Sequence, residues 1–341
     1  MERLTIKDIA RMAGVSPTVV SFVINNKPGV SNSTRKKVIE IIEETNFRPS
    51  LSSRRLILKK SFNISIVVRK DASPFNNLFY FEIAQGLLEK SKEYGYNIVF
   101  TDIPAVGNKF EFPEIIKQKD TDGVIFFQDT ESYILNEIEN LGIPCVVIDA
   151  HPDSDTYSYV MADYEKAAYT ATMHLIENGH NDIAFITSCT CPNFYTQVFS
   201  GFKKALDSKG ISIPSSWIQI DANDEKNEES AYECMQRILN SQNIPTAVLC
   251  TVDMYAASAI KCVKANGYRV PEDISFIGID DIILSRFIEP ALTTIRIDKK
   301  LMGSLAMDMI VKKINGQQVD NVVVASDNLI VRDSVRNLRM G

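Results

Sequence analysis

The sequence is short of several features, and each shortage excludes a class of protein. It has six cysteines in 341 residues, and none of them form a Cys-x-x-Cys pair. So few cysteines in a long chain exclude a disulfide scaffold and indicate reduced thiols in a cytoplasmic protein. No run of 18 apolar residues occurs, which excludes a transmembrane helix, and the N-terminus lacks the apolar core of a signal peptide.

Catalytic and metal-binding motifs are missing as well. The chain contains no Gly-x-x-x-x-Gly-Lys-Ser/Thr, no Gly-x-Gly-x-x-Gly and no His-Glu-x-x-His. Its three histidines, His151, His174 and His180, give no credible pair of base and nucleophile. A carbohydrate-modifying enzyme is therefore disfavoured, and we expect no catalytic residue, no metal and no cofactor.

What the sequence does contain is an uneven distribution of charge. The net charge is −6, yet residues 1–61 carry twelve Lys and Arg against five Asp and Glu, and the remainder carries −13. A basic head of +7 on an acidic body indicates a polyanionic partner for the head, although a solvated basic surface would give the same count. The 45% apolar and 23% charged residues are typical of a globular chain of two or three domains.

The head begins with two short helices separated by a glycine. Thr5 and Asp8 have the spacing of a capping box, Gly14 ends the first helix, and Ser16-Pro17 starts the second. The second helix has an apolar face of Val20, Val23 and Ile24, and an opposite face of Pro17, Thr18, Ser21, Phe22 and Asn25. This is the layout of a helix-turn-helix, whose second helix enters the major groove of DNA.

A third helix and a basic segment complete the head. Ser31 is a suitable cap for the third helix, which has a buried stripe of Val38, Ile41 and Ile42 and ends before Pro49. Two interpretations of residues 50–60 stay open. The segment is either a disordered linker or a helix that forms only on DNA, with Arg54 and Arg55 near phosphates and Leu56 in the minor groove.

Several motifs of the head together resemble the headpiece of the lactose/galactose repressor family. They are Thr5-Ile6-Lys7-Asp8-Ile9-Ala10, Ala13-Gly14-Val15-Ser16, Val20-Ser21, Val30-Ser31, Thr34-Arg35 and Asn46-Phe47-Arg48-Pro49. The resemblance implies DNA contacts at Thr5, Ile6, Ser16, Pro17, Thr18, Ser21, Phe22, Asn25, Ser31, Thr34, Ser50, Ser53, Arg54 and Leu56.

The head also departs from the family pattern. Val19 stands where the family usually has Thr, Phe22 stands where it often has Arg or Tyr, and Ser50 and Ser53 replace the usual Asn and Ala. Phe22 cannot pair with guanine as an arginine could, and it suits a thymine methyl group instead. The operator sequence therefore does not transfer from other members.

From residue 62 onward, short apolar runs alternate with amphipathic helices, which predicts parallel α/β sheets. The predicted strands are 64–68, 96–100, 123–127, 144–148, 183–187, 218–220, 247–250 and 274–279, and the predicted helices are 81–94, 165–178, 199–209, 230–242 and 256–266. The length indicates two similar lobes. We expect a helix-turn-helix headpiece over residues 1–49, a hinge helix or linker over 50–61, and a two-lobe effector-binding and dimerisation domain over 62–341.

Three aspartates follow apolar strands of the body, namely Asp149, Asp253 and Asp280. Open α/β sheets bind ligands beyond the carboxyl ends of their strands, where a carboxylate accepts hydrogen bonds from sugar hydroxyls or an amine. Each aspartate could equally cap the next helix, and both interpretations stay open. The aromatic cluster of Phe75, Phe79, Tyr80 and Phe81 is more typical of a core than of a sugar platform.

The family resemblance continues through the body, as in His174–His180, Gly201–Leu206, Val270–Gly278 and Pro290–Ile295. It implies a fold like periplasmic sugar-binding proteins, with a cleft between two lobes, three crossovers and a dimer. Asp280 matches an effector-contacting aspartate of the family, Asp149 occupies a strand end that faces the cleft, and Phe75 lies where a wall residue is common. Gln197 and Val198 stand near a usual pocket arginine, and Val252 precedes Asp253 where some members have Asn, so the pocket has lost familiar polar anchors.

These observations predict a sequence-specific DNA-binding regulator, of the repressor kind, controlled by a small-molecule effector of carbohydrate type. Its homodimer would bind a pseudo-palindromic operator. The alternative is a cytoplasmic solute-binding receptor without DNA function, against which the basic head speaks.

Overall fold

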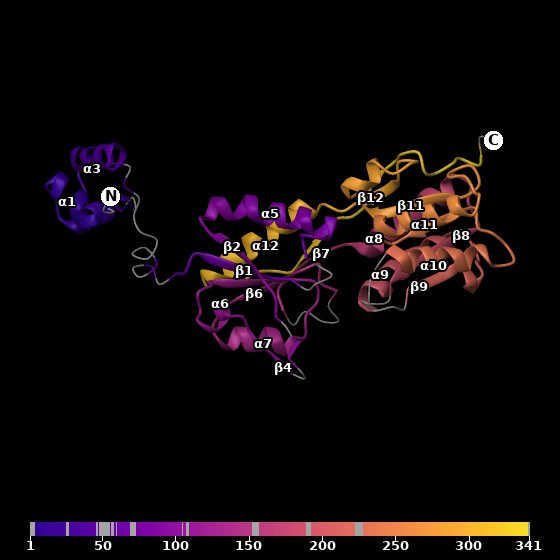
Figure 1. The fold of residues 1–341 in the computed structure, drawn as a ribbon, viewed down its shortest axis with the longest axis horizontal. Helices are drawn as coiled ribbons and strands as arrows, with labels where there is room; N and C mark the ends of the chain where they lie inside the picture. The colour runs from indigo at the N-terminus through magenta and orange to yellow at the C-terminus, as the bar shows by residue number, and fades with distance from the viewer. Residues whose placement is uncertain are drawn as a thin grey trace. The chain divides into compact units, whose positions relative to one another are not determined.

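The computed structural model describes residues 4–24, 27–45, 47, 55, 58, 60–68, 73–103, 105–106, 109–151, 157–188, 192–221 and 228–339. The chain divides into two units, Met1–Phe62 and Asn63–Gly341 (Figure 1). Each unit is described by itself.

In the part of the first unit that the structure describes, α1 (Ile6–Ala13), α2 (Pro17–Ile24) and α3 (Asn32–Glu44) pack as a bundle. The predicted capping box is present, since the Thr5 backbone N–H donates to Asp8 Oδ2 at 3.0 Å, and Gly14 ends α1 with φ of +67°. Ser31 caps α3 by accepting a hydrogen bond from the Thr34 N–H at 3.2 Å. The small core consists of Ile9, Ala10, Ala13, Val20, Val23, Val38 and Phe47. The three predicted helices of the head are therefore confirmed.

Within the described residues, the second unit contains a sheet of six strands in each of two lobes. The first sheet has the order β13-β7-β6-β5-β1-β2, and all of its strand pairs are parallel. Its strands are β1 (Asn63–Val67), β2 (Asn97–Thr101), β5 (Gly123–Phe127), β6 (Cys145–Ile148), β7 (Tyr159–Ala162) and β13 (Val322–Val324). A separate hairpin joins β3 (Ala105–Val106) to β4 (Lys109–Phe110).

Helices cover both faces of the first sheet. On one face, α12 (Lys299–Ile314) packs against α5 (Leu78–Tyr94) and the sheet (Figure 1). On the other, α7 (Ser132–Asn140) and α6 (Glu114–Lys117) close a core around Val124, Phe126 and Val147. The two helices α5 and α12 approach closely, because a Cβ built on Gly303 would lie 2.2 Å from the Ile83 carbonyl oxygen.

The second sheet has the order β14-β12-β11-β10-β8-β9, and only its edge pair β12–β14 is antiparallel. The strands are β8 (Ile183–Ser188), β9 (Ile218–Asp221), β10 (Ala247–Cys250), β11 (Ser275–Asp280), β12 (Thr293–Arg296) and β14 (Asn328–Ile330). Its helices are α8 (Tyr164–Glu177), α9 (Pro192–Ser208), α10 (Glu228–Leu239) and α11 (Asp253–Ala265), with 3₁₀ turns η1 (Ser215–Trp217) and η2 (Ile283–Arg286).

The chain crosses between the lobes three times, after β7, after β12 and after β13. The first two crossovers end in the same way: Asp163 caps α8 by accepting from the Lys166 N–H at 2.9 Å, and Asp298 caps α12 by accepting from the Leu301 N–H at 3.0 Å. The third crossover is tied to the first, because the Asp163 N–H donates to the Val324 carbonyl at 3.0 Å. The two-lobe architecture with parallel sheets and three crossovers is confirmed.

Candidate functional sites

The exposed side of α2 is the candidate DNA-contact surface of the head. Pro17 and Thr18 are exposed, and Ser21 and Phe22 are half-buried. Lys27 Nζ lies 5.8 Å from the centre of the Phe22 ring, so a cation accompanies the aromatic side chain. The surface offers hydroxyl, apolar and cationic groups, which are the kinds of group that contact bases and phosphates.

Three other head residues of the predicted set lie at helix N-termini, where unpaired N–H groups attract phosphate oxygens. Thr5 Oγ1 donates to Asp8 at 2.6 Å, Ser16 Oγ accepts from the Val19 N–H at 3.3 Å, and Ser31 Oγ donates to Thr34 Oγ1 at 2.8 Å. Ile6 is half-buried and packs against the head core. Asn25, Ser50, Ser53, Arg54 and Leu56 lie outside the described residues, so their DNA contacts stay predictions.

In the body, Asp149 is the centre of a polar cluster between the lobes. It lies just beyond β6, is 6% exposed, and has an unusual φ of +59°. Its two carboxylate oxygens accept hydrogen bonds from the hydroxyls of Tyr80 on α5 and Tyr164 on α8, the latter at 2.5 Å. Burial and the Asp149 charge raise the pKa of Tyr164 well above its usual 10, so this hydroxyl remains a donor.

His151 extends this cluster toward the second lobe. Asp129 accepts from the His151 backbone N–H at 2.7 Å and lies 3.0 Å from its Nδ1, which fixes the ring. Asn193 Nδ2 on α9 donates to the His151 carbonyl at 2.6 Å. The Phe194 ring lies edge-on to Tyr164 at 4.9 Å and to His151 at 5.4 Å. Aromatic rings from both lobes therefore surround Asp149.

Asp280 supplies the second carboxylate of the interlobe site, which we define as Tyr80, Asp149, His151, Tyr164, Phe194 and Asp280. It ends β11, is 6% exposed, and has φ of +123°, a conformation that L-residues rarely adopt. Burial raises the pKa of Asp280 well above its usual value; the charges of Asp253 and Asp149 add to the shift, while Lys299 opposes it. Among the described residues, no side chain or backbone N–H donates to the Asp280 carboxylate, which leaves it available for a ligand.

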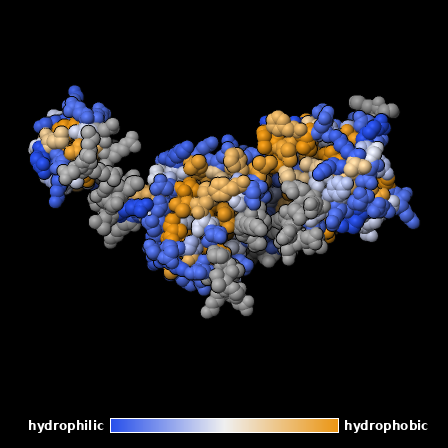
Figure 2. Space-filling view, in the orientation of Figure 1, coloured by the Kyte–Doolittle hydropathy of each residue, from blue (hydrophilic) through white to orange (hydrophobic). Residues whose placement is uncertain are grey.

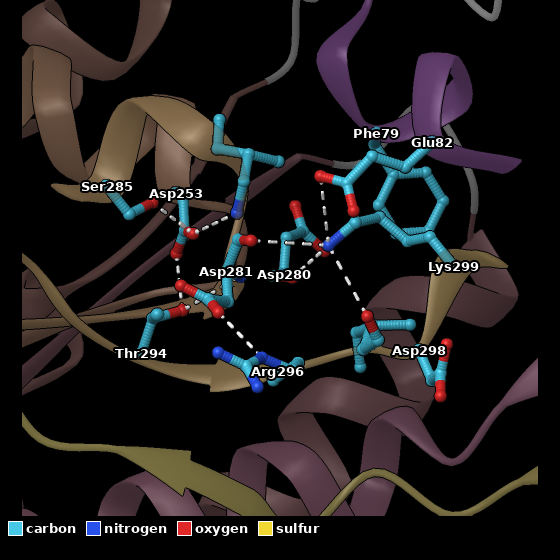
Figure 3. Close-up of polar contacts among 12 residues, drawn as sticks. Phe79, Glu82, Asp253, Asp280, Asp281, Ser285, Thr294, Arg296, Asp298 and Lys299 are labelled. Atoms are coloured by element: carbon cyan, nitrogen blue, oxygen red, sulfur yellow. Dashed lines mark hydrogen bonds and ion pairs between the residues drawn. The ribbon is translucent and has the colours of Figure 1, made fainter. Parts of the chain in front are cut away.

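The neighbouring Asp281 is fully engaged instead. Its carboxylate accepts a hydrogen bond from Arg332. It also accepts one from Arg296 Nε at 2.7 Å (Figure 3). Burial opposes ionisation, but these two guanidinium groups outweigh it and lower the pKa of Asp281 below its usual value. Asp281 therefore anchors the end of β11, whereas the buried Asp280 carboxylate accepts no such hydrogen bond from the described residues.

Asp253 is buried, and its carboxylate is already satisfied by groups of the second lobe. Its oxygens accept from Thr294 Oγ1 at 2.6 Å, Ser285 Oγ at 2.5 Å and the Ile282 N–H at 3.1 Å, all within the second lobe (Figure 3). A Cβ on Gly278 would lie 2.1 Å from Asp253 Oδ1, so the glycine makes room for the carboxylate. The capping alternative is wrong for Asp253, because Val252 occupies the N-cap of α11, and for Asp280, because Ile282 occupies that of η2.

The remaining predicted effector residues are Phe75, Gln197 and Val198. Phe75 is 80% exposed and its ring contacts Phe100 of β2, at a centroid distance of 5.5 Å. Val198 on α9 has no exposed surface, and Gln197 beside it is half-buried. Of the aromatic cluster predicted as core, Phe79 and Tyr80 are buried whereas Phe75 and Phe81 are exposed.

Sequence reasoning missed Tyr80 as a partner of Asp149, and it gave His151, Tyr164 and Phe194 no role. Only His151 carried a usable signal, since it follows Asp149 by two residues. His180 lies 3.0 Å from both Thr246 Oγ1 and the Arg336 carbonyl, contacts that give it a structural role. Within the described ranges, no cluster of His, Cys, Asp and Glu could hold a metal ion, and no helix is long and apolar enough to span a membrane.

Comparison with known proteins agrees with both units. Residues 5–50 match the family described as "Bacterial regulatory proteins, lacI family", and residues 172–335 match a "Periplasmic binding protein-like domain". The HTH-type transcriptional repressor PurR of Pasteurella multocida is 33% identical over 340 residues, covering 98% of this chain and 99% of that protein. The chain belongs to the lacI family. The resemblance predicted from its sequence motifs is therefore confirmed, and this lacI-family protein is a DNA-binding transcriptional regulator.

Solved structures of the lacI family share the fold. A lac repressor dimer bound to operator and the anti-inducer ONPF superposes with a TM-score of 0.76 at 23% identity, covering 98% of this chain and 100% of that chain. A complex of the transcriptional regulator CelR with cellobiose gives a TM-score of 0.69 at 26% identity, covering 97% and 100%. These similarities extend over the head and both lobes.

Proposed function

We propose that this lacI-family protein is a cytoplasmic, non-enzymatic repressor that releases or tightens its hold on an operator when a carbohydrate-type effector binds between the lobes. In this proposal, residues 1–49 are the DNA-binding headpiece and residues 50–61 are the hinge. Residues 62–341 are the effector-binding and dimerisation domain. The effector changes the relative populations of two lobe arrangements, and the hinge transmits the change to the head.

The single observation that carries the effector assignment is the unpartnered, buried carboxylate of Asp280 at the interlobe site. A carboxylate desolvated without a hydrogen-bond donor is costly, and ligand hydroxyls would supply donors. The rings of Tyr80, Tyr164 and Phe194 provide apolar surface beside it, as the faces of a sugar ring require. The structural similarity to a cellobiose-bound regulator supports the same ligand class.

A screen of ligands against the full chain tests this assignment. Sugars, sugar phosphates and nucleobases are each added to the protein, and the melting temperature is measured. We expect a sugar to raise it, and Asp280→Ala to abolish the rise while leaving DNA binding intact. Asp207→Ala is the control, because Asp207 is an exposed residue of α9 whose carboxylate accepts a hydrogen bond from Lys203, and this variant should keep the ligand response. An Asp280→Ala variant that responds like the native chain would remove Asp280 from the site.

We further propose that the protein is a homodimer, formed through an apolar surface that spans both lobes. Exposed apolar side chains gather on α5 and α12 in the first lobe and around η2 in the second (Figure 2); they are Leu78, Phe81, Leu88, Leu301, Ile283 and Phe287. Leu78, Phe81 and Ile283 line one hollow of about 550 Å³, so the two parts adjoin. Exposed apolar side chains that gather in one region, with charged residues among them, mark an association surface.

Phe287, which is 77% exposed, is the residue to test. We expect Phe287→Ser to lower the sedimentation coefficient at micromolar concentration from that of a dimer to that of a monomer. The reason is that it removes the most exposed aromatic ring of the patch. Tyr133→Ser, on α7 and 49% exposed, is the control and should leave the dimer intact. A dimeric Phe287→Ser variant would place the interface elsewhere.

A further inference from the structure

Lys299 is an unusual residue in the body because its ammonium group is buried. It is the first residue of α12, directly after the crossover from β12, and its side chain is 1% exposed. A lysine is rarely removed from water unless its charge and its N–H groups find partners. Its partners come from both lobes.

In the second lobe, Lys299 holds the turn that carries Asp280. Its Nζ donates to the backbone carbonyl of Asp280, and lies 3.4 Å from the carbonyl of Asp281 and 3.3 Å from that of Ile297 (Figure 3). Asp280 and Asp281 have φ of +123° and +51°, which are unfavourable for residues with a side chain. The ammonium therefore stabilises a strained conformation at the end of β11.

In the first lobe, the same ammonium contacts α5. Nζ lies 3.7 Å from Glu82 Oε1 and 5.9 Å from the centre of the Phe79 ring (Figure 3). The Phe79 ring is edge-on to that of Tyr80, at 5.2 Å, and the Tyr80 hydroxyl donates to Asp149. Lys299 thus contacts the residue that carries one candidate effector carboxylate and, through Phe79 and Tyr80, connects to the other.

We propose that Lys299 is a positioning residue that couples the two lobes, holding the Asp280 turn on one side and the N-terminal part of α5 on the other. The consequence of this coupling for regulation rests on the proposed function. An effector that binds Asp280 would alter the packing of α5 through the Lys299 ammonium. The coupling itself does not depend on any effector. A purely local role, in which Lys299 only satisfies three carbonyl groups, would leave α5 and the Asp280 turn independent of each other.

Hydrogen exchange of the full chain, followed by mass spectrometry without any ligand, separates these two roles. We expect Lys299→Met to increase exchange by about tenfold or more in peptides covering both residues 278–285 and residues 78–84, because it opens both segments locally. Glu82→Gln weakens only the first-lobe contact, yet we expect faster exchange in residues 278–285 of the second lobe. Lys300→Met is the matched control, since Lys300 is 51% exposed with Nζ 3.8 Å from Glu89, and it should leave both segments unchanged.

The proposal is overturned if Lys299→Met affects only one of the two segments, or if Glu82→Gln leaves residues 278–285 unchanged. Should Lys299→Met not fold, as judged by circular dichroism, Glu82→Gln decides the question alone, because Glu82 is a partly exposed residue of α5. If the ligand screen fails, the coupling through Lys299 is unaffected. If the exchange experiment fails, the effector assignment is unaffected, so the two proposals can be rejected independently.

Discussion

At the scale of single residues, the aspartates at the ends of β10 and β11 behave differently because their partners differ. The pKa of Asp281 is lowered because two guanidinium groups lie beside its carboxylate. The pKa of Asp280 is raised because its carboxylate is buried near other carboxylates. Asp253 lies between these cases: burial raises its pKa to about 6, although hydrogen bonds from Ser285 and Thr294 favour the charged form. The sequence placed these residues at strand ends, but their charge states depend on neighbours that lie far away in the chain.

The pKa of Asp253 predicts a pH dependence of stability. Because the folded value of about 6 exceeds the ordinary 3.8, the folded state binds more protons, and the stabilisation is complete below pH 4 and lost as the pH rises through 6. The full effect is ~3 kcal/mol at 1.36 kcal/mol per pKa unit, and pH 4 lies just above the unfolded pKa, so we expect the loss between pH 4 and 7 to be smaller in Asp253→Asn by ~2 kcal/mol. Urea unfolding of both proteins at the two pH values measures it. Parallel pH profiles would contradict the prediction.

At the scale of helices and strands, short sequence patterns correctly predicted those elements that residues close in the chain determine. The capping box of Thr5 and Asp8, Gly14 and the cap Ser31 lie where they were predicted, and all eight predicted strands of the body are present within a residue or two at each end. The strands β7, β12, β13 and β14 were missed. They have three or four residues each, and they are strands because a neighbouring strand of the sheet pairs with them, which no short pattern reveals.

The close packing of α5 against α12 could not be predicted from the sequence either. It leads to a testable prediction. Gly303→Ala should stabilise an isolated helix, but its Cβ would lie 2.2 Å from the Ile83 carbonyl oxygen, so α5 and α12 must separate. Overpacking wins over helix propensity, and we expect a loss of about 1–3 kcal/mol in unfolding free energy. Ser304→Ala, one residue further along α12, serves as control and should change stability by less than about 0.5 kcal/mol. Equal stability of the two variants would show that the helices adjust freely.

At the scale of the whole molecule, the charge asymmetry predicts how DNA binding responds to salt. Residues 1–61 carry +7 and the rest −13, so phosphate contacts fall to the head alone. If about six phosphates are neutralised, affinity for duplex DNA should fall by about a thousandfold between 50 and 200 mM salt. Filter binding of the full chain measures this slope. The chain from Asn63 onward is the control and should not bind, and a salt-independent affinity would argue against a contact dominated by phosphates.

Only part of the candidate site could be predicted from the sequence, because several of its residues come from segments that are far apart in the chain. Asp149 and Asp280 were found because each ends an apolar strand, a pattern confined to a few residues. Tyr80, Tyr164 and Phe194 meet there because α5, α8 and α9 bring them from three distant segments. Lys299 looks like any surface lysine in the sequence, and only the crossover after β12 buries it.

The order of strands also has a consequence for synthesis of the protein. The first lobe needs α12 and β13, which follow nearly the whole second lobe in the chain, so a ribosome must translate both lobes before either sheet is complete. Until residues 322–324 emerge, β7 remains an unpaired edge next to an apolar layer that α12 has not yet covered. The nascent chain therefore exposes apolar surface that chaperones bind until the late stage of translation, whereas the head is a separate compact unit with its own core and can fold as soon as it leaves the exit tunnel.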